Sequence, residues 1–244
     1  LKYDQLMALY DPADTRSAAS MKIFNIDGSL SGACGNGTRC VAWELMRDAA
    51  GRDLTLESDG GLLTVTRDAE FVFTVDMGTP KLGWRDIPLV GDGADTERVA
   101  LVPAVVGAPS AFSAVSMGNP HAVFFVDDAS AIDLAKLGGA IERHPLFPER
   151  VNVSFAQVRA RDSILLRVWE RGAGATRACG TAACATAVAG ARLGLTDRAA
   201  LVSLPGGDLR IHWRDSDDHV LMTGPVELEF ETVLDPVPRE DRKS

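Results

Sequence analysis

ACGNGTRC at residues 33–40 has an echo in ACGTAAC at residues 178–184, and both stretches begin with the same three residues. Each opens an apolar, helix-like run, and each run stops at a glycine, Gly51 in the first case and Gly194 in the second. Glycine commonly follows the last residue of a helix because it adopts the left-handed backbone conformation without strain. The two stretches therefore predict two helices that begin in the same way.

The predicted helical runs, residues 41–50 and 185–193, place Cys34 and Cys179 at the N-termini of the two helices. Unpaired backbone N–H groups and the positive end of the helix dipole favour a thiolate at such a position. Two thiols of this kind in one chain indicate paired acid/base chemistry.

The echo extends beyond the cysteines. Asn25 stands nine residues before Cys34, and Glu170 stands nine residues before Cys179. Downstream, a Gly-Gly pair in each half opens an alternating, strand-like run. A match that keeps its order over so many features indicates an internal duplication. We therefore predict an α/β protein of the α+β type, with two pseudo-symmetric halves that each have strands, a central helix and further strands.

Local patterns predict further elements. Period-two alternation and β-branched residues favour strands at residues 71–75, 122–126 and 164–169. Helix-type spacing of apolar residues favours a helix at residues 128–140. In the second half, residues 111–150 precede the duplicated part and have no counterpart in the first half. Either the two halves have diverged or this chain lacks an N-terminal segment; we favour the second as more economical, and the loss of a strand would leave a sheet edge unpaired.

Composition limits the classes of function. The chain of 244 residues is 46% hydrophobic and 24% charged, with a formal net charge of -9. An acidic protein is a poor partner for nucleic acid or an anionic membrane surface. We find no apolar run long enough for a membrane span and expect no secretory signal. Four cysteines in a chain of this length do not form a disulfide framework, so we expect a cytoplasmic protein with reduced thiols.

The two N-terminal cysteines suit proton transfer at carbon. One thiolate can remove a proton from a carbon between an amino group and a carboxylate, while the other thiol donates a proton to the opposite face. So weak a carbon acid needs a base in contact, a dry site and donors for the developing negative charge. The N–H groups at two helix starts can be those donors. The spacings of Cys34 to Cys40 and of Cys179 to Cys184 do not fit structural zinc patterns, and Cys40 and Cys184 are expected in the core.

Three further residues are candidates for the same site. His121 follows a Gly-Asn-Pro turn and precedes a strand, so it is either structural or placed to tune a thiol. Glu170 and Arg171 could hold the ammonium and carboxylate of a zwitterion, and the alternative is a surface ion pair.

Six motifs give the chain a family resemblance. They are FNIDGS at 24–29, CGNGTRC at 34–40, MGNPH at 117–121, RVNV at 150–153, WERGAG at 169–174 and ACGT at 178–181. On these motifs the chain resembles the diaminopimelate epimerases from residue 3 to about residue 231. The proline and hydroxyproline racemases share the two-cysteine plan, but this sequence is not similar to them around Asn-Pro-His and Glu-Arg-Gly.

The resemblance implies a fold and a reaction. Each half is expected to be a mixed sheet or barrel wrapped around a central helix, with the site in the cleft between the halves. The first domain is expected to comprise residues 1–79 and 225–244, and the second residues 80–224. The implied reaction is the interconversion of LL- and meso-diaminopimelate, as in lysine and peptidoglycan biosynthesis, by an isomerase that uses no cofactor and no metal. The expected partners are a small amino-acid substrate and a second copy in a homodimer.

The resemblance also assigns residues. Cys34 and Cys179 match the two catalytic bases, and His121 and Glu170 match residues that tune them. The implied substrate contacts are Gln5, Asn25, Gly35, Asn36, Asn119, Asn152, Glu170, Arg171, Gly180 and Thr181. The sequence departs from the family pattern at Ala175, where Glu is usual, and at Ala182, where Gly is usual. Two alternatives stay open: a racemase or epimerase of another small amino acid, and an N-terminally truncated, inactive form of the fold.

Overall fold

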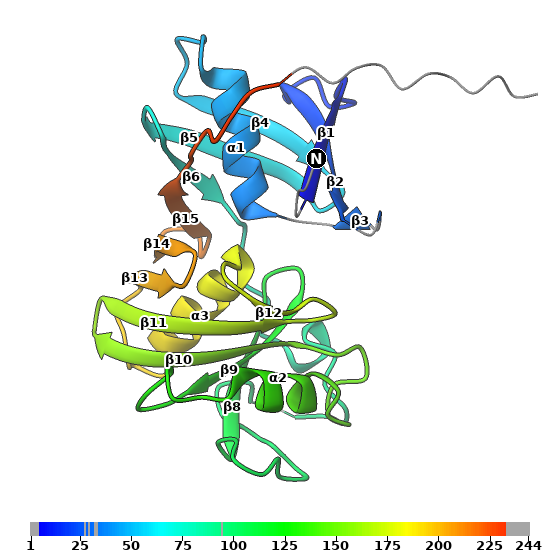
Figure 1. The fold of residues 1–244 in the computed structure, drawn as a ribbon, viewed down its shortest axis with the longest axis vertical. Coiled ribbons are helices and arrows are strands. Elements are labelled where there is room, and N and C mark those ends of the chain that lie inside the picture. Colours follow the sequence, from blue (N-terminus) through cyan, green and yellow to red (C-terminus); the bar gives the residue numbers. More distant parts are fainter. Residues whose placement is uncertain (1–4, 27, 29, 32–33, 94, 233–244) are drawn as a thin grey trace, which may run out of the picture.

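The computed structural model describes residues 5–26, 28, 30–31, 34–93 and 95–232. Its first part, the upper part of Figure 1, holds one helix against a curved set of strands. The elements are β1 (Gln5–Tyr10), β2 (Ala19–Asn25), β3 (Leu30–Ser31), α1 (Gly35–Met46), β4 (Asp53–Ser58), β5 (Gly61–Ala69) and β6 (Val72–Asp76).

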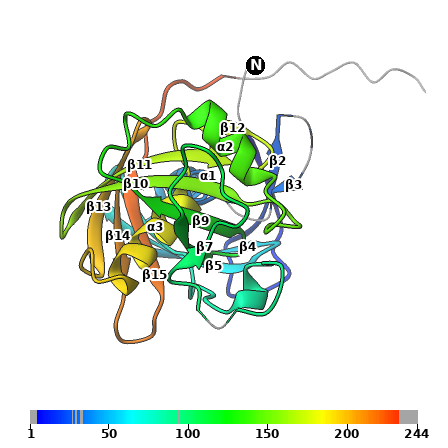
Figure 2. The ribbon, with the colours of Figure 1, turned by 90° about the horizontal axis from the view of Figure 1, so that it is seen from below.

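The second part is larger and carries two α-helices. A short 3-10 helix, η1 (Trp84–Asp86), leads into it. The remaining elements are β7 (Val99–Ala100), β8 (Ala111–Ser116), β9 (Pro120–Phe125), α2 (Leu134–Glu142), β10 (Asn152–Ala160), β11 (Ser163–Glu170), β12 (Gly174–Thr176), α3 (Gly180–Arg192), β13 (Ala199–Leu204), β14 (Gly207–Trp213) and β15 (Val220–Pro225). Seen from below, the strands of this part curve around α3 (Figure 2).

The strand pairing repeats, as the duplication predicts. In the first part, β1 pairs antiparallel with β2, β2 pairs parallel with β4 across α1, and β4, β5 and β6 follow as a meander. In the second part, β10, β11, β13, β14 and β15 pair in the same way around α3. The second part adds β8, β9 and α2, and within the described residues β1 has β2 as its only paired neighbour.

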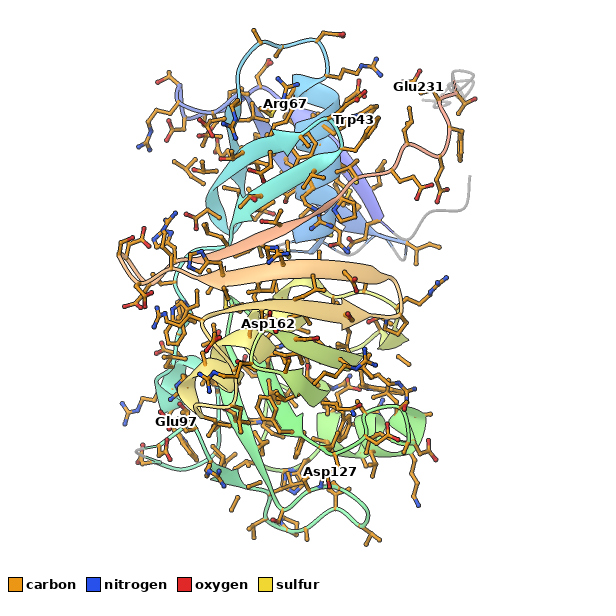
Figure 3. The ribbon with its side chains drawn as sticks, turned by 90° about the vertical axis from the view of Figure 1, so that its left-hand side faces the viewer. Trp43, Arg67, Glu97, Asp127, Asp162 and Glu231 are labelled. Carbon is orange, nitrogen blue, oxygen red and sulfur yellow. The ribbon has the colours of Figure 1, made fainter. Side chains whose placement is uncertain are left out.

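The last strand joins the two parts. The strand order is β1-β2-β4-β5-β6-β15-β14-β13-β11-β10-β9-β8-β7. β15 therefore lies between β6 of the first part and β14 of the second, antiparallel to both, and Figure 3 shows this ladder face-on. One hydrophobic cluster runs through both parts, and a second cluster lies between α2 and the β8–β10 strands. The structure is thus continuous across the level at which α1 and α3 meet.

Helix α3 is the most enclosed element. All residues from Gly180 to Gly190 are buried, and most of them are alanine, glycine or threonine. Small side chains let the surrounding strands approach the helix closely on all sides, so a helix with no polar face is stable here.

Two helix predictions were wrong at their ends. Helix α1 ends at Met46, four residues before the predicted end. Arg67 of β5 donates hydrogen bonds to the carbonyls of Met46, Ala49 and Gly51, at 2.6, 2.7 and 2.8 Å. The carbonyls near the helix end therefore accept hydrogen bonds from a distant arginine, whereas the helix was expected to run on to a glycine.

Helix α2 begins later than residue 128. Asp133 is its N-cap, with a side-chain oxygen that accepts the N–H of Lys136 at 3.1 Å. Asp128 instead accepts the N–H of Ser130 at 2.8 Å, which forms a turn ahead of the helix. The predicted strands at 71–75, 122–126 and 164–169 correspond to β6, β9 and β11.

Candidate active site

Cys34 is the N-cap of α1, as predicted. Its backbone is extended, at φ −147° and ψ 97°, and its carbonyl accepts the N–H of Thr38 at 2.9 Å. The thiol sulfur lies 3.3 Å from the N–H of Gly37, which donates to it. The side chain is half-buried, so the sulfur faces a partly dry site and touches one of the free N–H groups of the helix start.

Cys179 is the N-cap of α3 with nearly the same backbone, at φ −147° and ψ 108°. Its carbonyl accepts the N–H of Ala183 at 3.1 Å, and its sulfur lies 3.6 Å from Oγ1 of Thr181. Unlike Cys34 it is buried. The duplication has thus produced two cysteines in the same local geometry but in unequal solvent exposure.

The two helix starts lie against each other. In Figure 1, α1 lies above β15 and α3 below it. A methyl group built at Gly180 would lie 3.8 Å from Oδ1 of Asn36, a residue in the first turn of α1. Each first turn is therefore within contact distance of the other, which brings the two cysteine loops together.

Both thiols are held in the protonated form. Burial raises the pKa of Cys34, and the nearby Glu170 carboxylate adds to this, while the N–H groups of Gly37 and Asn36 act in the opposite direction. Burial raises the pKa of Cys179 much further, and Glu170 again adds to it. Glu170, at the end of β11, thus contributes to the raised pKa of both thiols, after burial.

Arg171 does not form the surface ion pair that was the alternative for Glu170 and Arg171. Arg171 is exposed; its backbone N–H donates to Oδ1 of Asn152 at 2.9 Å, and its guanidinium donates to the carbonyl of Glu149 at 3.1 Å. Within the described residues, no ion pair joins Arg171 to Glu170. Glu170, half-buried at the end of β11, is thus free to act on the thiols.

A chain of polar contacts links His121 to Cys179. His121 is fully buried, and burial, followed by the charge of Arg171, lowers its pKa to about 3. The neutral ring donates from Nε2 to Oδ1 of Asn119 at 2.9 Å. Nδ2 of Asn119 donates to Oγ1 of Thr181 at 3.3 Å, and that oxygen lies 3.6 Å from the Cys179 sulfur. His121 therefore reaches the thiol through two intervening side chains.

The other predicted substrate contacts differ in how firmly they are held. Asn152 is buried, and its amide donates to the carbonyl of Pro120 at 2.9 Å while accepting from Arg171, so it braces two loops of the site. Oδ1 of Asn36 accepts from Arg39 at 3.1 Å. Gln5 stands opposite Asn25 in the β1–β2 register, which places both at one end of that strand pair.

Arg39 is a residue of the site that sequence reasoning missed. It is 5% exposed and donates to Oδ1 of Asn36 at 3.1 Å, to the Pro225 carbonyl at 3.4 Å and to the Gly35 carbonyl at 3.5 Å. Within the described residues, no carboxylate pairs with Arg39, and its hydrogen-bond acceptors are two carbonyls and an amide oxygen. A buried, unneutralised positive charge thus lies at the start of α1. Its spacing of three and four residues from Asn36 and Gly35 was the available signal, because such residues are neighbours on a helix.

The other two cysteines differ in solvent exposure. Cys184 is buried, as predicted, and burial raises its pKa to about 12. Cys40 is exposed, so the expectation that it lies in the core was wrong. It occupies the one position of the turn from Gly37 to Ala42 that faces outward.

The described residues carry neither a metal cluster nor a membrane-spanning helix. Among them, no group of three or more histidine, cysteine or acidic side chains is arranged to hold a metal ion. Their helices also include none that is long and apolar enough to cross a membrane.

Comparison with known proteins gives a consistent result. The family model described as Diaminopimelate epimerase matches residues 5–83 and 113–229. A diaminopimelate epimerase of Methylobacterium sp. (strain 4-46) is 59% identical over 237 residues, which cover 94% of this chain and 80% of the relative. One of Rhodopseudomonas palustris (strain BisB18) is 54% identical over 236 residues, covering 96% and 82%.

Solved structures share the fold at low identity. A predicted epimerase from Pseudomonas aeruginosa has a TM-score of 0.64 and 18% identity, covering 93% of this chain and 85% of that one. A probable proline racemase from Agrobacterium radiobacter K84 has a TM-score of 0.66 and 16% identity, covering 96% and 77%. At such identity the likeness concerns the fold alone.

Proposed function

The chain belongs to the diaminopimelate epimerase family, and from that premise we propose that it interconverts LL- and meso-2,6-diaminopimelate with Cys34 and Cys179 as its two bases. Its membership of this family identifies it as an isomerase, more specifically an amino-acid epimerase. The choice of substrate and the two-thiol mechanism are the proposal.

One observation carries the mechanism: the two cysteines cap helices whose first turns touch, in nearly identical backbone conformations. Two groups placed in this way can face one substrate carbon from opposite sides.

The reaction follows from that arrangement. One sulfur, as thiolate, takes the α-hydrogen, and the electron pair of the broken C–H bond stays on the α-carbon and its carboxylate. The other thiol then gives its proton to the opposite face of that carbon, which inverts the centre. Free N–H groups at the two helix starts offset the negative charge that develops on the carboxylate. After one turnover the protonation states of the two sulfurs are exchanged.

Glu170 supplies a route to the reactive state. Because burial keeps both sulfurs protonated in the free site, one thiol must first lose its proton. We propose that the Glu170 carboxylate, which contributes to the raised pKa of both thiols, accepts that proton from the thiol that becomes the base. His121, Asn119 and Thr181 hold the Cys179 side of the site through neutral hydrogen bonds.

The remaining expectations complete the proposal. The predicted substrate contacts, the domain limits at residues 79/80 and 224/225, a cytoplasmic location and a homodimer all belong to it. Strand β15, paired on both edges, marks where the two proposed domains join. Sedimentation of the reduced protein at several concentrations would test the dimer.

The experiment that tests the function is deuterium incorporation. The reduced protein is incubated with LL-diaminopimelate in heavy water, and the α-hydrogen is followed by proton NMR. Loss of the α-hydrogen signal together with appearance of the meso isomer is the expected result. No exchange in a folded sample would overturn the proposal for this chain, and faster turnover of proline or hydroxyproline in a substrate panel would replace it with the alternative.

A further inference from the structure

Met222 lies directly beneath both cysteine loops. The residue is fully buried in the middle of β15. A methyl group built at Gly35, the residue after Cys34, would overlap Cε of Met222. A methyl group built at Gly180, the residue after Cys179, would lie 2.9 Å from Sδ and 3.2 Å from Cε of the same side chain. One thioether thus fills the space beside both helix starts.

The backbone of Met222 is fixed on both edges. It is paired with Val75 of β6 on one side and with Ile211 of β14 on the other. The ladder in Figure 3 shows β15 between the two parts of the molecule. Met222 therefore has little freedom to move with one part and away from the other.

Two other methionines pack beside the first turn of α1. Sδ of Met77 would lie 3.4 Å from a methyl group at Gly35, and the end of the Met7 side chain occupies the space beside Gly37. Both contacts are with α1. Of these three methionines, Met222 is the one that also contacts the start of α3.

We propose that Met222 is a positioning residue that sets the distance and alignment between the Cys34 and Cys179 sulfurs. This inference rests on the proposed two-thiol function. A two-base reaction needs both sulfurs in line with one carbon, and an error of about 1 Å in such an arrangement can cost ~100-fold in rate. Glycine at positions 35 and 180 lets the thioether touch the backbone of both helix starts, so its length is transmitted directly to the two loops.

The proposal predicts a specific defect beyond slower turnover. When the two sulfurs are misaligned, the thiolate still removes the α-hydrogen, but the opposite thiol delivers its proton less often. The abstracting thiol, after exchange with solvent, then returns a deuteron to the original face. The ratio of deuterium in recovered LL substrate to deuterium in the meso product therefore rises, which mere loss of stability would not cause.

The experiment compares Met222→Ala and Met222→Leu with Met46→Ala. Met46 is an equally buried methionine of the same core cluster, at the far end of α1. We expect Met222→Ala to lower kcat about 100-fold, with little change in KM and a higher substrate-to-product deuterium ratio. Met222→Leu, which nearly conserves volume, should restore most of kcat. Met46→Ala should lower the melting temperature and leave the ratio at its wild-type value.

Each outcome decides the question. If Met222→Ala and Met46→Ala give the same deuterium ratio, the positioning role is wrong. If Met222→Ala does not fold, Met222→Val, which shortens the side chain but places a residue with high strand propensity in β15, is judged by the same ratio. If the wild type itself does not turn over diaminopimelate, the proposed function fails, and cross-linking of Cys34 to Cys179 by a short bis-alkylating reagent tests the spacing alone. A lower cross-link yield in Met222→Ala than in Met46→Ala would support the inference, and equal yields would overturn it.

Discussion

At the scale of single residues, opposing effects set the pKa of the two thiols. Helix N–H groups favour a thiolate at Cys34 and Cys179, whereas burial and the Glu170 carboxylate favour the thiol. Burial prevails at both positions and prevails by more at Cys179. The two sulfurs are therefore alike in geometry and unequal in acidity, so Cys34 is the easier of the two to ionise in the free protein.

Replacing either cysteine with alanine should abolish epimerisation in both directions. Inversion needs a base on one face and an acid on the other, and neither sulfur can do both in one turnover. Turnover of LL- and meso-diaminopimelate by Cys34→Ala and Cys179→Ala, followed by proton NMR, measures this. Cys40→Ala, which removes an exposed thiol of α1, is the matched control and should keep full activity. Substantial turnover by Cys34→Ala would rule out the two-base mechanism.

Arg39→Met should weaken both the fold and the reactivity of Cys34. The change removes three hydrogen bonds, so the carbonyls of Gly35 and Pro225 each lose a hydrogen-bond donor. We expect the free energy of unfolding to fall by about 1–3 kcal/mol, and Cys34 to be alkylated more slowly at a given pH because a nearby positive charge is gone. Urea unfolding and mass-resolved alkylation are the measurements.

An arginine at the C-cap of the same helix gives the control. Arg47 is exposed and its ion pairs are at the surface, so Arg47→Met should change stability by no more than about 0.5 kcal/mol. Arg39→Lys should not reach wild-type stability, since an ammonium group cannot donate hydrogen bonds in the same planar arrangement as a guanidinium. Equal effects of Arg39→Met and Arg47→Met would show that Arg39 has no special role.

At the scale of elements, the sequence predicted the starts of α1 and α3 but not the end of α1 or the start of α2. The cysteine caps of α1 and α3 follow from local residue types, because capping is an interaction within one turn. The end of α1 depends on Arg67, which reaches it from a strand far along the chain. No local pattern carries that information, and the same holds for Arg39 and Pro225 at the other end of α1.

Two adjacent glycines of α2 should respond oppositely to alanine. A methyl group at Gly138 would overlap Cγ of Trp169 and lie 2.6 Å from its Cβ, so Gly138→Ala should push α2 away from β11. We expect a loss of about 1–3 kcal/mol in the free energy of unfolding. A methyl group at Gly139 would lie 3.4 Å from Cζ2 of Trp169, an ordinary contact. Gly139→Ala should therefore stabilise the helix by about 0.5–1 kcal/mol.

Chemical denaturation of the two variants checks this pair. Because Trp169 precedes Glu170 in β11, Gly138→Ala should also lower kcat, whereas Gly139→Ala should not. Equal stability of the two variants would mean that α2 and Trp169 adjust freely, contrary to the close packing described here.

At the scale of the whole molecule, the duplication explains why the site lies where it does. Each half supplies one cysteine that caps a helix. Strand β15 joins the halves because it pairs with β6 along one edge and with β14 along the other. The echo in the sequence was enough to predict the repeated strands and the paired cysteines. It was not enough to find Met222 or Arg39, because their roles depend on contacts between elements that the echo does not relate.

The sharing of one reaction between two halves gives a prediction about pH. The proposed mechanism requires one sulfur ionised and the other protonated, so kcat/KM should follow the singly ionised form of a coupled pair. Since burial and Glu170 raise the pKa of both thiols, that form is scarce at neutral pH and increases as pH rises. We expect kcat/KM to climb with pH, with a midpoint above the ordinary thiol value of about 8.5.

Glu170→Gln separates the two causes of this shift. Two causes raise the pKa of the thiols, burial and the Glu170 charge. Removing the charge leaves burial alone, so the rising limb of kcat/KM should move to lower pH. Its maximum should fall, since the proposed acceptor of the thiol proton is lost. The pH dependence of Cys34 alkylation in a Cys40→Ala background should shift in the same direction. A limb that stays in place in Glu170→Gln would mean that burial alone sets the acidity of the pair and that Glu170 lies too far from the sulfurs to take their proton.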